Sequence, residues 1–196
     1  MNRSVELAGL LGVCACASAY AEGPRLSLEL ETERDRRSGI RSYAVSAKPG
    51  WEFSRGSPIN LVELLVERSE DAERDELGFR ERETKLFLRI RHVGQLTAKA
   101  TYYIRGGVGR NLNNERDFTY ANVEPGLKYE LTDRWEWSFG VRFTDAIDGT
   151  DGQRVRKYIT GPSYAFDKAN EVELRYARGS GDKDLTSWSI GLVHRF

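Results

Sequence analysis

The stretch that decides the fold is residues 135–144, which read WEWSFGVRFT. Every second residue in it is large and apolar, from Trp135 to Phe143, and the residues between are charged or small, including Glu136 and Arg142. A period of two is the pattern of a β-strand with one apolar and one polar face. Because a shift of one residue would exchange the two faces, the register of this strand is strongly fixed.

The same alternation recurs along most of the chain. We predict strands over residues 25–33, 41–53, 59–68, 83–92, 95–105, 119–131, 135–144, 156–166, 171–177 and 187–196. In the run INLVELLVER (59–68) both parities are partly apolar, so the phase of this strand stays open.

The connections between these runs are of two kinds that interleave without exception. Short ones read SRGSP, HVGQ, TDR and DKAN, and longer charged or Gly-rich ones read DRRSG, SEDAERDELG, GGVGRNLNNERDF, AIDGTDGQR and RGSGDKD. Tight turns at one end and looser loops at the other are typical of an outer-membrane barrel. We therefore predict an all-β fold, a closed antiparallel up-and-down transmembrane β-barrel of about ten strands, with twelve as the alternative. An even count places both chain ends at the short-turn, periplasmic end.

The aromatic residues distinguish a membrane barrel from a soluble one. This topology puts one group near the short turns: Trp51, Phe53, Tyr129, Trp135, Trp137, Tyr164, Phe166 and Phe196. A second group falls near the other end: Tyr43, Tyr102, Phe143, Tyr158, Tyr176 and Trp188. Two aromatic belts around an aliphatic band match a bilayer cross-section. We therefore expect apolar side chains to face lipid and charged ones to face the barrel axis.

The N-terminus indicates export. Arg3 precedes a largely apolar stretch and Ala19-Tyr20-Ala21 is a small-x-small cleavage site, so residues 1–21 are predicted to be a secretory signal peptide and 22–196 the barrel. A lipoprotein cut before Cys16 is the alternative. Cys14 and Cys16 lie in the removed segment, so we expect neither a disulfide nor a thiolate metal site.

Three prolines conflict with the strand pattern. Pro49, Pro125 and Pro162 each lie four residues before an aromatic residue near a predicted strand end. Proline cannot donate to a ladder and is unusual in a central strand. Either the three runs share a bend or bulge, or their strands are shorter than predicted.

The last residues resemble the C-terminal assembly signal of bacterial outer-membrane proteins, in which a polar residue and a glycine precede two aromatic positions. Ser189, Gly191, His194 and Phe196 occupy these positions, although a tyrosine or large apolar residue is usual where His194 stands. The resemblance implies recognition by the barrel-assembly machinery.

The inward faces of the predicted strands carry two sets of charges. The fourth and fifth strands supply a basic set that we interpret as a solute track: Lys85, Arg89, Arg91, Lys99 and Arg105. The first and ninth supply an acidic set that would face it across the lumen: Glu29, Glu31, Glu171 and Glu173. Adjacent strands lined with cations favour an anionic solute in a narrow passive channel. The alternative is a salt-bridged lumen that closes a structural or adhesive barrel, whose loops 69–79 and 106–118 would bind a partner.

The segments ANVEPGLKYELTDRWEWSFGVRF and TGPSYAFDKANEVELRYARG, together with the final strand, resemble the oligogalacturonate-specific (KdgM-like) porin family. This resemblance implies a small monomeric barrel that carries acidic sugars past an arginine-lined track. Barrels of that family are expected to have twelve strands, whereas ten are predicted here.

Other functions have little support in the sequence. His92 and His194 fall at the short-turn end without a Ser or Asp placed for a nucleophile relay, so we expect no enzyme activity. Asp145, Asp148 and Asp151 lack the full spacing of a calcium loop, and we expect no metal or other cofactor. Lys plus Arg and Asp plus Glu both number 30, which argues against nucleic-acid binding. The expected partners are outer-membrane lipid and lipopolysaccharide, in the outer membrane of a Gram-negative bacterium.

Overall fold

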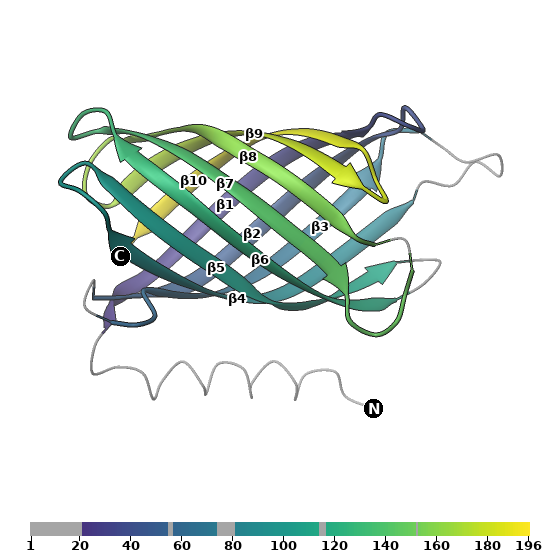
Figure 1. Ribbon diagram of the computed structural model, residues 1–196, viewed down its shortest axis with the longest axis horizontal. Helices are drawn as coiled ribbons and strands as arrows, with labels where there is room; N and C mark the ends of the chain where they lie inside the picture. Colours follow the sequence, from purple (N-terminus) through teal and green to yellow (C-terminus); the bar gives the residue numbers. More distant parts are fainter. Residues whose placement is uncertain (1–20, 55–56, 74–80, 114–116, 152) are drawn as a thin grey trace.

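The chain forms a closed barrel of antiparallel strands (Figure 1). The structure is a computed structural model that describes residues 21–54, 57–73, 81–113, 117–151 and 153–196. The predicted signal peptide lies outside the described residues except for Ala21, and so do Cys14 and Cys16. Among the described residues, no helix is long and apolar enough to span a membrane.

Within this described part there are ten strands, and each pairs with its sequence neighbours. Their bounds are β1 Ala21–Asp35, β2 Arg41–Phe53, β3 Leu61–Asp71, β4 Arg82–Gln95, β5 Ala100–Asn113, β6 Phe118–Glu130, β7 Trp135–Ala146, β8 Val155–Ala165, β9 Asn170–Gly181 and β10 Leu185–Arg195. Pairing of β1 with β10 closes the barrel, which leaves no strand edge exposed to lipid. The predicted fold class and strand count are confirmed.

The strands extend further into the long-loop end than predicted. The expected loop 106–118 is mostly strand, because β5 runs to Asn113 and β6 begins at Phe118. Gly106, Gly107 and Gly109 form part of β5 and pair with β4, but glycine has no side chain to show which face it occupies. Alternation of apolar and polar residues therefore could not identify this stretch as a strand. The contrast in length between the two sets of connections is weaker than the sequence indicates.

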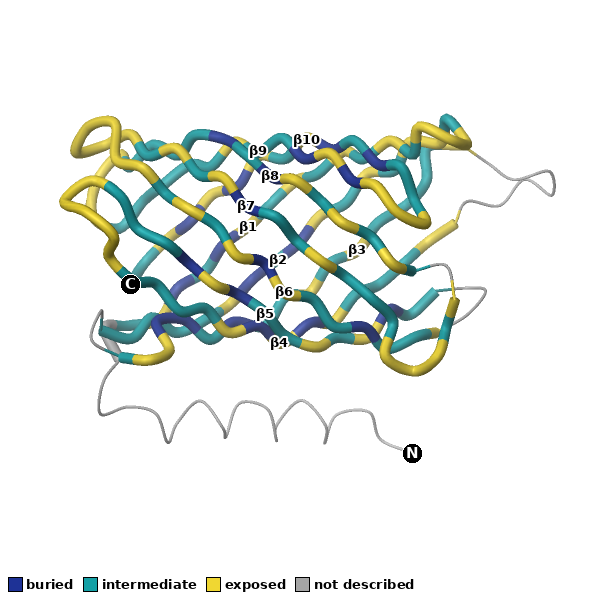
Figure 2. Tube along the Cα trace, in the orientation of Figure 1, coloured by how far each residue is buried: buried dark blue, intermediate teal, exposed yellow. Residues whose placement is uncertain are grey.

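The barrel is apolar outside and polar inside, as predicted. Trp137, Phe139 and Leu192 are about half exposed on its surface, whereas Glu136 and Arg142 point inward and form ion pairs with lumen residues. Figure 2 shows buried and exposed residues alternating along the strands. In β3 the open phase is settled, since Leu61 and Glu63 are buried inside and Val66 is exposed.

Each of the three prolines lies within a full-length strand. On one side of Pro49, Pro125 and Pro162 the ladder is continuous, and on the other it is interrupted for two residues and then resumes in the same register. The strands are therefore not shortened, and no bulge shifts the register at these sites. Proline lacks the N–H that a complete ladder would need. Two inward charges, Lys48 and Glu124, directly precede prolines at these gaps.

Candidate functional site: the barrel lumen

The lumen is lined by charged side chains of both signs, and each of the ten strands supplies at least one. The inward cations are Arg25, Lys48, Lys85, Arg89, Arg91, Arg105, Lys128, Arg142, Lys157, Arg175 and Arg195. The inward carboxylates that pair with them are Glu29, Glu31, Glu33, Glu52, Glu63, Glu67, Glu83, Glu124, Glu136, Glu171 and Glu173. The two sets are equal in size, so this part of the lumen is close to electroneutral.

The most deeply buried group is Glu124 on β6, whose side chain is 0% exposed. It forms an ion pair with Arg105 on β5 and a second with Arg142 on β7, whose Nε lies 2.8 Å from Glu124 Oε2. The hydroxyl of Tyr103 donates a third hydrogen bond to Oε1 at 3.0 Å. A buried carboxylate needs such partners to offset the loss of hydration.

A second buried pair joins β3 to β4. Arg89 Nε lies 2.6 Å from Glu63 Oε1, and the two residues are 6% and 4% exposed. Lys48 on β2 pairs with Glu29 on β1, which lies 3.9 Å from Arg175 on β9. These contacts link strands around the lumen. We call the central group of Glu63, Arg89, Arg105, Glu124, Arg142 and Tyr103 the constriction.

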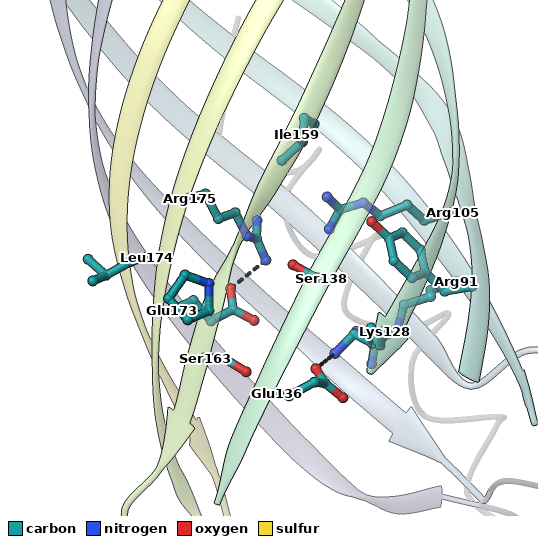
Figure 3. A pocket seen from close by; sticks show the side chains of 12 residues that line it. Arg91, Arg105, Lys128, Glu136, Ser138, Ile159, Ser163, Glu173, Leu174 and Arg175 are labelled. Carbon is teal, nitrogen blue, oxygen red and sulfur yellow. Dashed lines mark hydrogen bonds and ion pairs between the residues drawn. The ribbon is translucent and has the colours of Figure 1, made fainter. Parts of the chain in front are cut away.

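The lumen is nearly filled at the constriction and on its short-turn side. Two cavities there have volumes of only about 20 and 10 Å³, which is room for about one water molecule each. Figure 3 shows the larger one, with Arg91, Arg105 and Arg175 pointing into it and the Lys128–Glu136 and Arg175–Glu173 pairs along its side.

On the loop-end side of the constriction the lumen is open. The cavity at the loop end has a volume of about 310 Å³. We call it the vestibule. Its floor includes Arg89 and Arg142, and its rim includes Asp35, Asp71 and Lys183. The lumen is therefore open at the loop end and nearly filled at the constriction.

The predicted solute track is only partly assembled. Lys85, Arg89, Arg91 and Arg105 face the lumen, whereas Lys99 is exposed in the turn 96–99 before β5. The expected inward position of Lys99 is therefore wrong, because its strand begins one residue later.

The residues of the predicted acidic set also face the lumen. However, the basic set across the lumen from them is not unpaired. Glu29 pairs with Lys48, Glu31 with Lys157, Glu171 with Arg195 and Glu173 with Arg175. The track cations have their own carboxylates, namely Glu67, Glu63 and Glu124 on adjacent strands and, for Arg91, Glu52 two strands away on β2. Sequence reasoning missed the constriction because it compared distant strands, and because the phase of β3 hid Glu63 and Glu67. The alternating pattern already placed Glu124 on the polar face of its strand.

The two histidines lie at the short-turn end, and the other residues of the predicted assembly signal lie along β10 and at its end. His92 Nδ1 is 2.9 Å from the carbonyl oxygen of Pro58, and His194 Nδ1 is 2.9 Å from Asn170 Oδ1. Ser189 and Gly191 lie on the inward face of β10, while His194 packs edge-on against Phe196 at the outer surface. Over the residues described, no group of three or more His, Cys, Asp or Glu is placed to hold a metal ion.

No protein-family model and no curated protein matches this sequence. Solved structures do resemble it. An outer-membrane channel from Pseudomonas putida F1 is 10% identical, with 90% of this chain and 96% of that chain covered and a TM-score of 0.54. The β domain of the Bordetella autotransporter BrkA is 10% identical, with coverage of 90% and 100% and a TM-score of 0.52. The KdgM porin is 10% identical, with coverage of 88% and 99% and a TM-score of 0.47.

The fold is that of an outer-membrane β-barrel. Its closed sheet and apolar exterior place the chain in the bacterial outer membrane. At these identities the similarity extends to the fold alone.

Proposed function

We propose that this barrel is a narrow, porin-like passive channel whose conducting path is limited by ion pairs at mid-height. The observation that carries the proposal is the contrast between the open vestibule and the filled constriction. A solute from outside would enter the vestibule freely, meet Arg89 and Arg142 at its floor, and then meet Arg105 within the constriction. Passage would then require these side chains to move apart, so lumen width limits the size of what crosses.

The proposed solutes are small ions and polar molecules, without a preference for anions. An anion track needs cations that no nearby carboxylate neutralises. Here Arg89 pairs with Glu63 and Arg105 with Glu124, and both pairs are buried. A solute would therefore meet alternating charges of both signs. We expect selectivity by size to exceed selectivity by charge.

Single-channel conductance in a planar bilayer tests the proposal. We expect small, steady conductance from the wild-type barrel and a severalfold increase from the double variant Glu63→Ser with Arg89→Ser. Removing both partners widens the constriction without leaving an unpaired buried charge, which would itself destabilise the barrel. The matched control is Glu67→Ser with Lys85→Ser, a pair in the wide vestibule, which should leave conductance unchanged.

A closed structural barrel is the second candidate, and the small size of the cavities beside the constriction favours it. In this case the wild-type protein would be electrically silent and only the widened variant would conduct. Silence of both proteins would show that the constriction is not what blocks the lumen, and both candidates as stated here would fail.

A further inference from the structure

On the outer face of β9, β10, β1 and β2, three successive rows of side chains toward the loop end differ in chemical type. The first row across these strands is aliphatic: Leu174, Ile190, Leu30 and Val45. The second is mostly aromatic: Tyr176, Trp188, Thr32 and Tyr43. The third is mostly basic: Arg178, Thr186, Arg34 and Arg41. Successive rows are two residues apart, or roughly 7 Å.

The aromatic row marks the membrane interface. Trp188 is 61% exposed, and its ring lies 4.8 Å from that of Tyr176. Aromatic rings of this kind sit at the level of the lipid headgroups. On each of these strands the residue of the basic row is two residues further from the bilayer centre than that of the aromatic row, which brings the guanidinium groups toward the headgroup phosphates.

Two residues of the basic row are directly opposite one another. Arg34 on β1 and Arg41 on β2 are register partners, and both are exposed on the outer face. Like charges in this position are destabilising. Across the described ranges, neither arginine has a carboxylate within salt-bridge distance. A third arginine, Arg178, lies two strands from Arg34 and likewise has no such partner in those ranges.

Outward arginines on the opposite strands β4 and β5 are neutralised, whereas Arg68 on β3 and Arg156 on β8 have no salt-bridge partner among the described residues. Arg82 pairs with Glu70 at 3.3 Å, and Arg110 pairs with Asp117 at 3.4 Å. The unpaired outward arginines therefore lie on β8, β9, β1, β2 and β3, and the neutralised ones on β4 and β5. An arrangement that is unfavourable alone becomes favourable when an anion lies between the two guanidinium groups, which can each bind phosphate through two parallel hydrogen bonds.

We propose that Arg34, Arg41 and Arg178 bind the phosphate groups of a phosphorylated glycolipid of the lipid A type in the outer leaflet. The acyl chains would lie along the aliphatic row and the sugar over Trp188. The arginine pair would hold one phosphate, and Arg178 would hold a second. This site faces the membrane and does not depend on whether the lumen conducts.

Lipid binding by the purified, folded barrel tests the proposal. The probe is diphosphoryl lipid A in phosphatidylcholine nanodiscs, and the readout is lipid retained per barrel by native mass spectrometry. We expect Arg34→Gln with Arg41→Gln to lower the affinity at least tenfold. The matched control is Arg82→Gln with Arg110→Gln, which removes the same charge at the same end and should change affinity less than twofold.

Two results would overturn the proposal. One is an equal loss of lipid A from the control variant, which would indicate a general effect of net charge. The other is equal retention of phosphatidylglycerol by the wild-type barrel, which would indicate that any anionic lipid suffices. The direction of the stability change gives an independent test. Arg34→Gln should leave the urea midpoint unchanged or raised in pure phosphatidylcholine, and should lower the midpoint when lipid A is present. The same sign in both lipids would also count against the site.

Discussion

The two halves of the lumen have similar chemistry but different openness. Both are lined by paired charges, yet the short-turn half contains cavities of about 20 and 10 Å³ and the loop-end half one of about 310 Å³. In the closed half, the long side chain of Arg105 borders the larger of the two small cavities, and the long side chain of Tyr103 lies over the glycines of β6 and β7. In the open half, short ones such as Ser42, Ala44 and Thr144 line part of the wall. Short side chains also line the closed half, as at Ser138 and Ser163, and long ones the open half, as at Lys85, so the two halves differ in how closely these side chains pack.

Aromatic residues also differ between the two halves. In the vestibule, Phe87 and Tyr120 stack on each other, with ring centroids 5.3 Å apart and planes 19° from parallel, and so cover one side of the wall. In the constriction, Tyr103 instead lies across Gly126 and Gly140 and donates its hydroxyl to Glu124. Both arrangements lie against the barrel wall, but only Tyr103 is hydrogen-bonded to the buried ion pairs of the constriction.

The largest expected effect comes from breaking the constriction at Glu124. Changing Glu124→Gln would leave Arg105, whose side chain is 9% exposed, buried without its carboxylate, and would also remove the ion pair of the quarter-exposed Arg142. Breaking a buried pair in this way typically costs about 3–5 kcal/mol, so we expect a loss of that order in the free energy of unfolding. Urea unfolding in lipid vesicles, followed by tryptophan fluorescence, measures it.

The matched control is Glu136→Gln, since the Glu136 and Lys128 side chains remain about a quarter exposed and can be hydrated. It should cost clearly less, on the order of 1 kcal/mol. Equal losses from the two variants would contradict the idea that the two carboxylates differ through burial.

A smaller effect is expected where Tyr103 crosses the wall. A Cβ added at Gly126 would lie 2.2 Å from Tyr103 Cζ, so Gly126→Ala must displace the ring. Overpacking of this kind costs about 1–3 kcal/mol. Conductance should also change, because the ring is part of the constriction.

Gly191→Ala is the control, since the nearest atom to its added Cβ is 3.6 Å away. Refolding from urea into vesicles avoids the assembly machinery, so any assembly role of Gly191 does not enter the measurement. If both alanine variants unfold at the wild-type midpoint, Tyr103 is not held against β6 as the structure has it.

Much of the architecture could be predicted because the alternating pattern reports directly which face each residue occupies. Trp137 and Arg142 were placed on the correct sides from spacing alone. The pattern failed where side chains carry no such information, as at Gly107 in β5. It also could not show which charges meet, since Glu124 and its two partners come from three strands whose relative heights depend on register.

The smallest effect concerns the two ends of the barrel, at Asp167 in the turn 166–169 and Asp148 in the loop between β7 and β8. The Asn170 side chain, helped by the backbone N–H groups of Ala169 and Asn170, donates hydrogen bonds that lower the pKa of Asp167 from its ordinary value of 3.8. At the other end, the backbone N–H of Thr119 lowers the pKa of Asp148 in the same way. A lowered pKa in the folded state stabilises the fold above pH 3.8, and this contribution disappears as pH falls through the lowered value.

We therefore expect Asp167→Ala and Asp148→Ala each to lower the urea midpoint slightly at neutral pH, and to match the wild-type protein in strong acid. Asp167 closes a local turn, whereas Asp148 ties the loop at the mouth of the vestibule to β6. Only Asp148→Ala should therefore make the mouth more mobile, which amide hydrogen exchange at Thr119 would detect. A midpoint difference that persists in strong acid would mean that turn geometry, and not the ionised carboxylate, is what stabilises either end.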